Sequence, residues 1–472
     1  MDLETITESG RVRGRPVAGV TAFLGIPYAT PPFGPRRFLP PRPARPWSGV
    51  RDCHRFGPVA PQSARLPGAP VWSPRDEDVL TLNVWTPQPA ERLPVLVWIH
   101  GGAYSFGSSA QPDFDGAALA RAGLVVVTCN FRLGFDGFGR LEDFPDNRGL
   151  LDQAAALRWV RDNIAGFGGD PAAVTVCGQS SGAGSIVCLM DHAMDLAPGL
   201  FQRAILHSVP DACFSSDFAA TIAQEVAAQA GVAPALTSPR QLVAASDRVA
   251  AASLGTAPGR RGYDPVLYGP VLDHDPRPDP AVELLVCHTT REYWLFDEVG
   301  GLARVQDDDA LADFARALDI PASVLAGYRD AMPGATVREL YLALFGDRIF
   351  GAHSTRLALR HAEAGGQTYL ARFARQRRRP DGSAVHPWHC ADVPFCFGNI
   401  EAPEAEFLIG GPPDDADRAL SQRMMRAWAD FAATGDPGWR PLGAAARPVR
   451  VWDVDNADPQ RILAPPLDLW FR

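Results

Sequence analysis

Gly178-Gln179-Ser180-Ser181-Gly182 is the most informative stretch of this chain. It follows the apolar run Val174-Thr175-Val176-Cys177 and precedes a run of small residues that can begin a helix. A Gly-x-Ser-x-Gly sequence between a strand and a helix forms a sharp turn that pushes the serine hydroxyl out of the backbone. Glycine is needed on both sides because a Cβ there would collide in so tight a bend. The pattern predicts Ser180 as a nucleophile.

The composition limits the classes of function. The chain has 472 residues, of which 46% are hydrophobic and 21% charged, as in a soluble globular protein with a large core. Its net charge of −9 argues against a nucleic-acid partner or an anionic membrane, since both need a basic surface. All 45 basic residues are arginines, so a lysine Schiff base and a P-loop lysine are excluded.

The cysteines and the N-terminus indicate a compartment. None of the eight cysteines forms a Cys-x-x-Cys pair, so a zinc knuckle or a redox motif is not expected. Cys129, Cys177 and Cys287 lie in apolar runs and are predicted to be buried thiols. The first residues have neither a basic start nor an apolar stretch, and no apolar run approaches the ~20 residues that span a bilayer. We therefore expect a cytoplasmic protein with reduced thiols and no membrane partner.

Strand-like and helix-like patterns alternate along the chain. Short apolar runs typical of buried parallel strands occupy 95–99, 124–127, 174–176, 204–206, 284–286 and 368–370. Apolar residues recur with helical spacing over 150–164 and again from Leu420 to Phe431, where Gly435 can end the helix. This alternation predicts an α/β fold with a mostly parallel central sheet and helices on both faces. Two Ala-rich stretches, roughly 215–260 and 301–365, are interpreted as helical lid insertions in a single domain over 1–472.

A second motif is typical of an oxyanion hole. Trp98-Ile99-His100-Gly101-Gly102-Ala103 follows a strand and opens a Gly/Ser-rich loop. In an α/β-hydrolase such a loop supplies backbone N–H donors, and the N–H of the residue after the nucleophile, here Ser181, supplies another. A plain Gly-rich loop is the alternative. The same fold places the nucleophile, the acid and the histidine in that order along the chain.

Further motifs extend along most of the chain. They include Phe23-Leu24-Gly25-Ile26-Pro27-Tyr28-Ala29, Glu77-Asp78-Val79-Leu80-Thr81-Leu82-Asn83-Val84, Asn130-Phe131-Arg132-Leu133-Gly134 and Phe167-Gly168-Gly169-Asp170-Pro171. With the two glycine motifs, they make the chain resemble a type-B carboxylesterase, from the cholinesterase-like branch of the α/β-hydrolases. The region 210–365 is much less distinctive.

The resemblance implies the remaining site residues. The family's acid is a glutamate in a Thr-Arg-x-Glu-like segment after a strand, which matches Glu292; Asp297 and Glu298 lie further from that strand. The family's histidine lies nine residues before the Gly of a Phe-Gly pair, so Phe397-Gly398 indicates His389 and not His386. The oxyanion donors would be the N–H groups of Gly102, Ala103 and Ser181.

Other family features are carried over by the same resemblance. They are an Arg37–Glu77 ion pair, an Arg132–Asp170 ion pair, and Ser208 close to the triad. The chain also departs from the family. The cysteines of a common disulfide are replaced by Ala60 and Val79, and Gln179 and Ala103 stand where glutamate and glycine are common. Asp392 occupies a position that is usually acidic.

The predicted function is hydrolysis of carboxylic esters through an acyl-enzyme on Ser180, without a metal or an organic cofactor. The partner would be a small-molecule ester, and the protein a monomer or a homodimer. Two alternatives stay open: hydrolysis or acyl transfer of an amide, carbamate or lactone, and a non-catalytic cholinesterase-like binding protein. Aromatic residues near the motifs either line the substrate pocket or pack in the core: Tyr104, Phe106, Phe214, Trp294 and Trp388.

Overall fold

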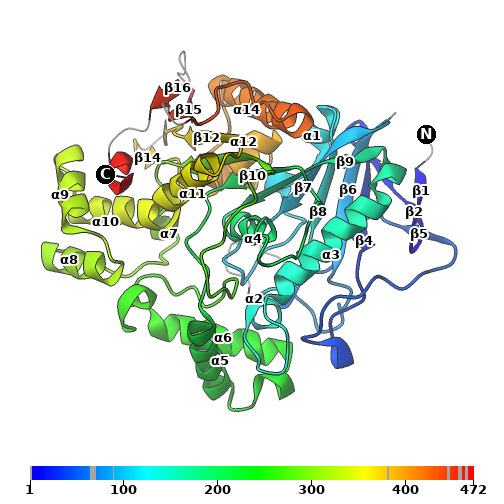
Figure 1. Ribbon diagram of the computed structural model, residues 1–472, viewed down its shortest axis with the longest axis horizontal. Coiled ribbons are helices and arrows are strands. Elements are labelled where there is room, and N and C mark those ends of the chain that lie inside the picture. Colours follow the sequence, from blue (N-terminus) through cyan, green and yellow to red (C-terminus); the bar gives the residue numbers. More distant parts are fainter. Residues whose placement is uncertain are drawn as a thin grey trace.

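The computed structural model describes residues 3–63, 71–88, 90–379, 382–443, 447–454, 460–462 and 466–471. Within this part, eleven strands form one sheet (Figure 1). Their spatial order is β16 (Gln460–Ile462), β15 (Pro448–Trp452), β12 (Thr368–Phe373), β11 (Glu283–Thr289), β10 (Arg203–His207), β9 (Gly169–Gln179), β7 (Leu93–Ile99), β8 (Val125–Cys129), β6 (Thr81–Pro87), β4 (Val20–Pro27) and β3 (Arg15–Val17).

The sheet is parallel in its middle and antiparallel at its ends. All neighbours from β15 to β8 pair in parallel, whereas β16, β6, β4 and β3 pair antiparallel. The six strands predicted from apolar runs all lie in the parallel part, which confirms them. Two smaller sheets consist of β1 (Glu4–Thr7), β2 (Gly10–Arg13) and β5 (Val50–Asp52), and of β13 (Arg377–Arg378) and β14 (Ala384–Val385).

Helices cover both faces of the sheet (Figure 1). The α-helices are α1 (Ala117–Arg121), α2 (Gly134–Phe138), α3 (Arg148–Asn163), α4 (Ser181–Leu189), α5 (Ser216–Ala230), α6 (Pro239–Ser253), α7 (Trp294–Glu298), α8 (Asp308–Ala317), α9 (Ala322–Ala331), α10 (Val337–Gly346), α11 (Ala352–Glu363), α12 (Val393–Phe397), α13 (Ala405–Ile409) and α14 (Asp415–Thr434). Shorter turns are η1 (Gly34–Arg36), η2 (Pro112–Phe114), η3 (Ile164–Phe167), η4 (Pro234–Leu236), η5 (Gly259–Gly262), the π-turn η6 (Asp347–Gly351) and η7 (Leu467–Phe471). As predicted, Gly435 ends α14, with φ +80°. In the described part, no helix combines the length and apolar character needed to cross a membrane.

Side chains of one strand alternate between two cores, as the pleat requires. On β7, Val95, Val97 and Ile99 join the core that contains α3 and α4. Leu96 and Trp98 join the opposite core, which contains α1, α12 and α14. Burial on both faces explains why the strands read as continuous apolar runs. The fold is therefore the α/β-hydrolase architecture expected from the sequence.

The two Ala-rich stretches are helical, but they differ in position. The first forms α5 and α6, which pack on each other. In the second, α8, α9 and α10 surround a separate apolar cluster. Its last helix, α11, packs on β11 and β12, between which it lies in sequence. This helix is thus a crossover connection of the sheet, and only the part before it lies outside the sheet layers.

Both ion pairs carried over from the family are wrong. The guanidinium of Arg132 pairs with Asp152, with Nη2 2.7 Å from Oδ1, and both side chains are buried. Asp170 is the second residue of β9 and pairs with Arg92. It lies near the N-terminal ends of the parallel strands, whereas Arg132 follows the C-terminal end of β8.

Arg37 also has a different partner. Its Nε lies 2.6 Å from Oδ1 of Asp136, and both groups are largely buried. Glu77, the predicted partner, is exposed. A buried guanidinium gains more from a carboxylate that shares its burial than from one that water already solvates.

Candidate active site

The predicted nucleophile lies at a strained turn between β9 and α4. Ser180 has φ +54° and ψ −125°, a backbone conformation that residues other than glycine rarely adopt. Close packing explains the flanking glycines. A Cβ on Gly182 would lie 2.1 Å from the carbonyl oxygen of Ile99, and one on Gly178 would lie 2.8 Å from the carbonyl carbon of Gly182. The turn therefore needs the sequence pattern that predicted it.

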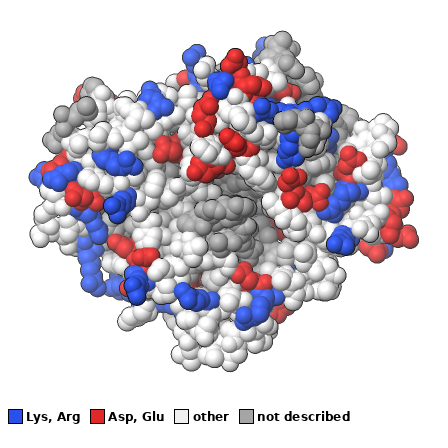
Figure 2. Space-filling model, turned by 180° about the vertical axis from the view of Figure 1, so that it is seen from behind, with Lys and Arg blue, Asp and Glu red and all other residues white. Residues whose placement is uncertain are grey.

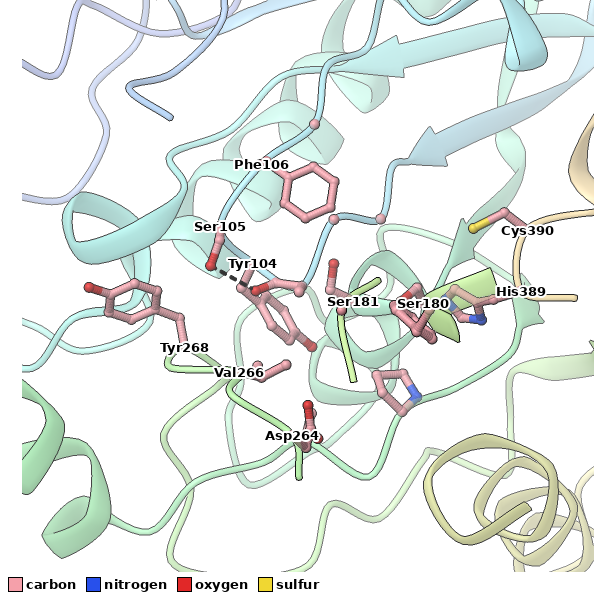
Figure 3. A pocket seen from close by; sticks show the side chains of 18 of the residues that line it. Tyr104, Ser105, Phe106, Ser180, Ser181, Asp264, Val266, Tyr268, His389 and Cys390 are labelled. Atoms are coloured by element: carbon pink, nitrogen blue, oxygen red, sulfur yellow. Dashed lines mark hydrogen bonds between the residues drawn. The ribbon is translucent and has the colours of Figure 1, made fainter. Parts of the chain in front are cut away.

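The His-Gly-Gly loop offers unused backbone donors. Gly102 has φ +118° and Ala103 φ +50°, and the carbonyl oxygen of Gly102 accepts hydrogen bonds from the N–H groups of Ser105 and Phe106. Among the described residues, the N–H groups of Gly102 and Ala103 donate to no protein acceptor. Ser181 is the first residue of α4, so its N–H has no acceptor within the helix. All three residues line the same cavity as Ser180. Figure 3 labels Ser180 and Ser181 there.

His100 packs in the core beneath this loop. Its ring is buried and stacks on Phe131, and Nδ1 lies 2.7 Å from the carbonyl oxygen of Gly101. Burial lowers the pKa of His100 to about 4, so the ring is neutral at physiological pH. His100 therefore acts as a structural element of the loop.

Glu292 and His389 form a buried pair. Nδ1 of His389 lies 2.5 Å from Oε2 of Glu292, and the backbone N–H of His389 donates to the carbonyl oxygen of Glu292. The other carboxylate oxygen accepts hydrogen bonds from Ser208 Oγ at 2.7 Å and from the N–H of Thr289 at 2.8 Å. Ser208 thus lies where the resemblance predicted. With three donors, the carboxylate is held in one orientation.

The other nitrogen of His389 has an unexpected partner. Nε2 lies 2.9 Å from the amide nitrogen of Gln179. Ser180 and His389 face the same cavity (Figure 3), but within the described part no hydrogen bond joins Ser180 Oγ to the imidazole. The rings of Phe296 and Phe350 pack against the imidazole, with the Phe350 centroid 4.3 Å away.

A second buried network lies beneath this pair. His207 Nδ1 lies 2.6 Å from Oδ2 of Asp392, and the indole N–H of Trp428 donates to His207 Nε2 at 2.9 Å. Burial tends to raise the pKa of Asp392, but interaction with His207 outweighs it and the pKa is lowered. Asp392 is therefore a charged anchor for the loop that carries His389.

The same network contains three potential metal ligands. One ligand atom each from His207, Cys287 and Asp392 lies within 4.8 Å of the others. However, both ring nitrogens of His207 already have partners, and burial raises the pKa of the Cys287 thiol well above its usual value. Because a metal needs a free lone pair and a thiolate, these residues do not fit one.

The cavity beside Ser180 has a volume of about 490 Å³. Tyr104 and Phe106 line it, as predicted. Trp294, Trp388 and Phe214 lie outside the lining, which corrects the prediction for them. Trp388 donates to the carbonyl oxygen of Leu408 and stacks on Phe407, Trp294 packs on Arg291 and His386, and Phe214 packs on Phe218.

Sequence reasoning missed other parts of the lining. Val266 and Tyr268 come from the segment after η5, and Phe296 and Phe350 from α7 and η6. Phe296 ends the segment that carries Glu292, but no signal in that segment marked its ring as part of the cavity. The segments of Val266, Tyr268 and Phe350 carry no motif. On the face seen in Figure 2, arginines and carboxylates are interspersed around a central hollow, with no continuous basic stripe among the residues coloured there.

Comparison with known proteins gives a consistent result. Residues 2–463 match the family model described as the carboxylesterase family. Similar sequences include a para-nitrobenzyl esterase of Bacillus subtilis (strain 168), 34% identical with 91% of this chain and 90% of the relative covered. A phenmedipham hydrolase of Pseudarthrobacter oxydans is 32% identical, with 97% and 94% covered. A solved structure of a PNB esterase superposes with a TM-score of 0.84 at 30% identity, covering 100% of this chain and 99% of that one.

Proposed function

The chain belongs to the carboxylesterase family and is a carboxylic ester hydrolase, and from that premise we propose that Ser180 is its nucleophile, His389 its general base and Glu292 the acid that orients the base. The observation that carries the proposal is the buried Glu292–His389 pair, whose imidazole faces the same cavity as Ser180. The three residues follow the chain order of an α/β-hydrolase.

The reaction has two acyl-transfer steps. His389 Nε2 takes the proton of Ser180 while Oγ attacks the ester carbonyl, and the imidazolium then protonates the leaving alcohol. A water molecule repeats the sequence on the acyl-enzyme and releases the acid. Glu292, held by its three donors, keeps the proton on Nδ1 and stabilises the imidazolium.

The N–H groups of Gly102, Ala103 and Ser181 would hold the oxyanion. In support of this role, they line the cavity beside Ser180 and have no acceptor in the described part of the loop or in α4. One such donor lowers the barrier by about 3–4 kcal/mol in other enzymes. The methyl group of Ala103 narrows the space beside the oxyanion but leaves the backbone N–H of Ala103 available as a donor.

The proposed substrate is a small-molecule ester. The cavity has room for one, and aromatic rings such as Tyr104 and Phe106 can pack against an aryl or benzyl group. Since two relatives are named para-nitrobenzyl esterase and PNB esterase, p-nitrobenzyl esters are the first substrates to try. The choice of acyl acceptor, the assembly as a monomer or homodimer and the cytoplasmic location stay predictions.

Replacement of Ser180 tests the proposal. The variant Ser180→Ala should lose ester turnover, whereas Ser185→Ala should retain it. Ser185 lies on α4, the helix that begins directly after Ser180, and its side chain is buried, so the variant is a nearby control for folding. Turnover by Ser180→Ala at the rate of the unmodified enzyme would refute the assignment.

A further inference from the structure

The Gln179 side chain lies at the centre of the site, although the reaction outlined above does not use it. Gln179 is the last residue of β9 and immediately precedes Ser180, and its side chain is buried. Its amide nitrogen lies 2.9 Å from Nε2 of His389, the atom that must take the serine proton. The general base is therefore already engaged in the structure without substrate.

The direction of this hydrogen bond follows from the other side of the ring. Nδ1 of His389 faces the Glu292 carboxylate at 2.5 Å and must carry a proton. In the neutral ring, Nε2 then has only a lone pair, so the amide N–H donates to it. Turned over, the amide would place its carbonyl oxygen against that lone pair. In the structure, the side-chain oxygen of Gln179 lies beside Gly101 instead. A Cβ built on Gly101 would lie 2.5 Å from this oxygen.

The lone pair on Nε2 of His389 cannot accept hydrogen bonds from the Gln179 amide and the Ser180 hydroxyl at the same time. While the amide of Gln179 occupies Nε2, Ser180 Oγ cannot pass its proton there, and no hydrogen bond between the two is found in the described part of the site. We propose that Gln179 is a positioning residue that caps the resting imidazole of His389 and must be displaced before Ser180 is activated. This inference rests on the proposed roles of Ser180 and His389.

The cap has a signature in the dependence of kcat/KM on pH. The amide stabilises the neutral imidazole in a form that cannot accept the serine proton, and the imidazolium, whose Nε2 carries a proton, cannot accept the amide N–H at all. Loss of the cap therefore speeds the reaction where the ring is neutral. Loss of the cap leaves kcat/KM unchanged at low pH. There the resting form is the imidazolium, and the free-energy difference between the imidazolium and the uncapped imidazole does not depend on the cap.

Other charged or titratable groups around the ring remain in place. Glu292 faces Nδ1 from the segment after β11, and Cys390 and Asp392 follow His389 in its own loop. His207 at the end of β10 binds Asp392, and Asp347 on η6 interacts with Glu292. Of these groups, the Cys390 thiol also forms a hydrogen bond with the Gln179 side chain. Burial raises the pKa of this thiol well above its usual value, so it is neutral across the acid limb with or without that bond, and a change in the profile reports on the Gln179–His389 contact.

The variant Gln179→Ala is the first test. We expect its high-pH plateau of kcat/KM for a p-nitrophenyl ester to rise about 2- to 10-fold, the effect of removing one neutral hydrogen bond. The midpoint of the acid limb should move up by the logarithm of that factor, with unchanged rates at low pH. A plateau at or below that of the unmodified enzyme, or lower rates at low pH, would overturn the proposal, since a packing role predicts loss of activity.

The variant Gln179→Glu provides an independent arm in a nearly isosteric side chain. Its carboxylate would pair with the imidazolium, so rates at low pH should fall and the acid limb should move up by about 1–3 pH units. An unmoved limb would contradict direct contact between residue 179 and Nε2. Gln153→Ala, which removes a buried amide that donates to Ser185, is the matched control and should leave the limb in place. Activity in Ser180→Ala would instead refute the proposed function itself.

Discussion

Replacement of Glu292 by glutamine should invert the tautomer of His389. The oxygen that accepts from Ser208 and Thr289 has to remain an acceptor, because the backbone N–H of Thr289 cannot turn away from it. The amide oxygen of the introduced glutamine would therefore take that place, and its NH₂ group would face Nδ1. A donor at Nδ1 drives the ring proton to Nε2, where it blocks the transfer from Ser180.

The size of the effect follows from this inversion. The corresponding change in the triad of a serine protease lowers kcat about 10⁴-fold with the geometry intact. That factor equals roughly 5.5 kcal/mol of transition-state stabilisation. We expect Glu292→Gln to lose activity to the same order. The structural loss should be small, because the amide has the shape of the carboxylate and keeps two of its three partners.

The assay is kcat/KM for a p-nitrophenyl ester, with the melting temperature measured in parallel. Asp297→Asn and Glu298→Gln are matched controls, since these nearby acids pair with Arg338 and Arg379 instead. Both should stay within a few-fold of the unmodified enzyme. Activity of Glu292→Gln within 10-fold of normal, or a larger loss in either control, would show that the wrong acid has been assigned.

Two further predictions concern stability. Asp152→Asn leaves the buried Arg132 guanidinium without its counter-charge and should lower the free energy of unfolding by about 3–5 kcal/mol in urea titrations. Asp170→Asn, in the more exposed pair with Arg92, should lower it much less. Equal losses would contradict the pairing. Burial lowers the pKa of His288 from 6.5 to about 3, so below pH 6.5 the unfolded chain takes up a proton that the folded ring does not, and stability falls. Between pH 7.5 and 5, this group lowers the free energy of unfolding by about 2 kcal/mol. The variant His288→Gln should lack this part of the decrease. If the free energy of unfolding of the variant fell as steeply with pH as that of the unmodified protein, the prediction would be wrong.

Much of the fold could be predicted from the sequence because the signals are local. A strand buried on both faces must be apolar throughout, and the runs at 95–99 and 174–176 became β7 and β9 for that reason. The turn at Ser180 needs glycine on both sides because Ile99 and the α4 backbone approach so closely. Such constraints fix the residue types within one short segment, so the strand or the turn can be predicted from that segment alone.

Contacts between distant segments left no such pattern. The partners of Arg37 and Arg132 were carried over from the family, and the structure replaced them with Asp136 and Asp152. Trp388 is adjacent to His389 in sequence, yet its ring points to Leu408 and away from the cavity. Whether a side chain lines a pocket depends on the direction of its Cα–Cβ bond in space, and proximity to a motif does not fix that direction.

Gln179 shows the same limit within the motif itself. The sequence identified the position as a departure from the usual glutamate, but its contact with His389 joins residues 210 positions apart. Only the assembled sheet edge brings that amide to the imidazole.

Covalent labelling can identify the nucleophile of this enzyme directly. After reaction with an organophosphonate ester, intact-mass spectrometry should show one adduct per chain, and peptide mapping should place it on Ser180, with loss of ester turnover in proportion to labelling. An adduct on another residue, or full turnover by a chain labelled at Ser180, would contradict the account.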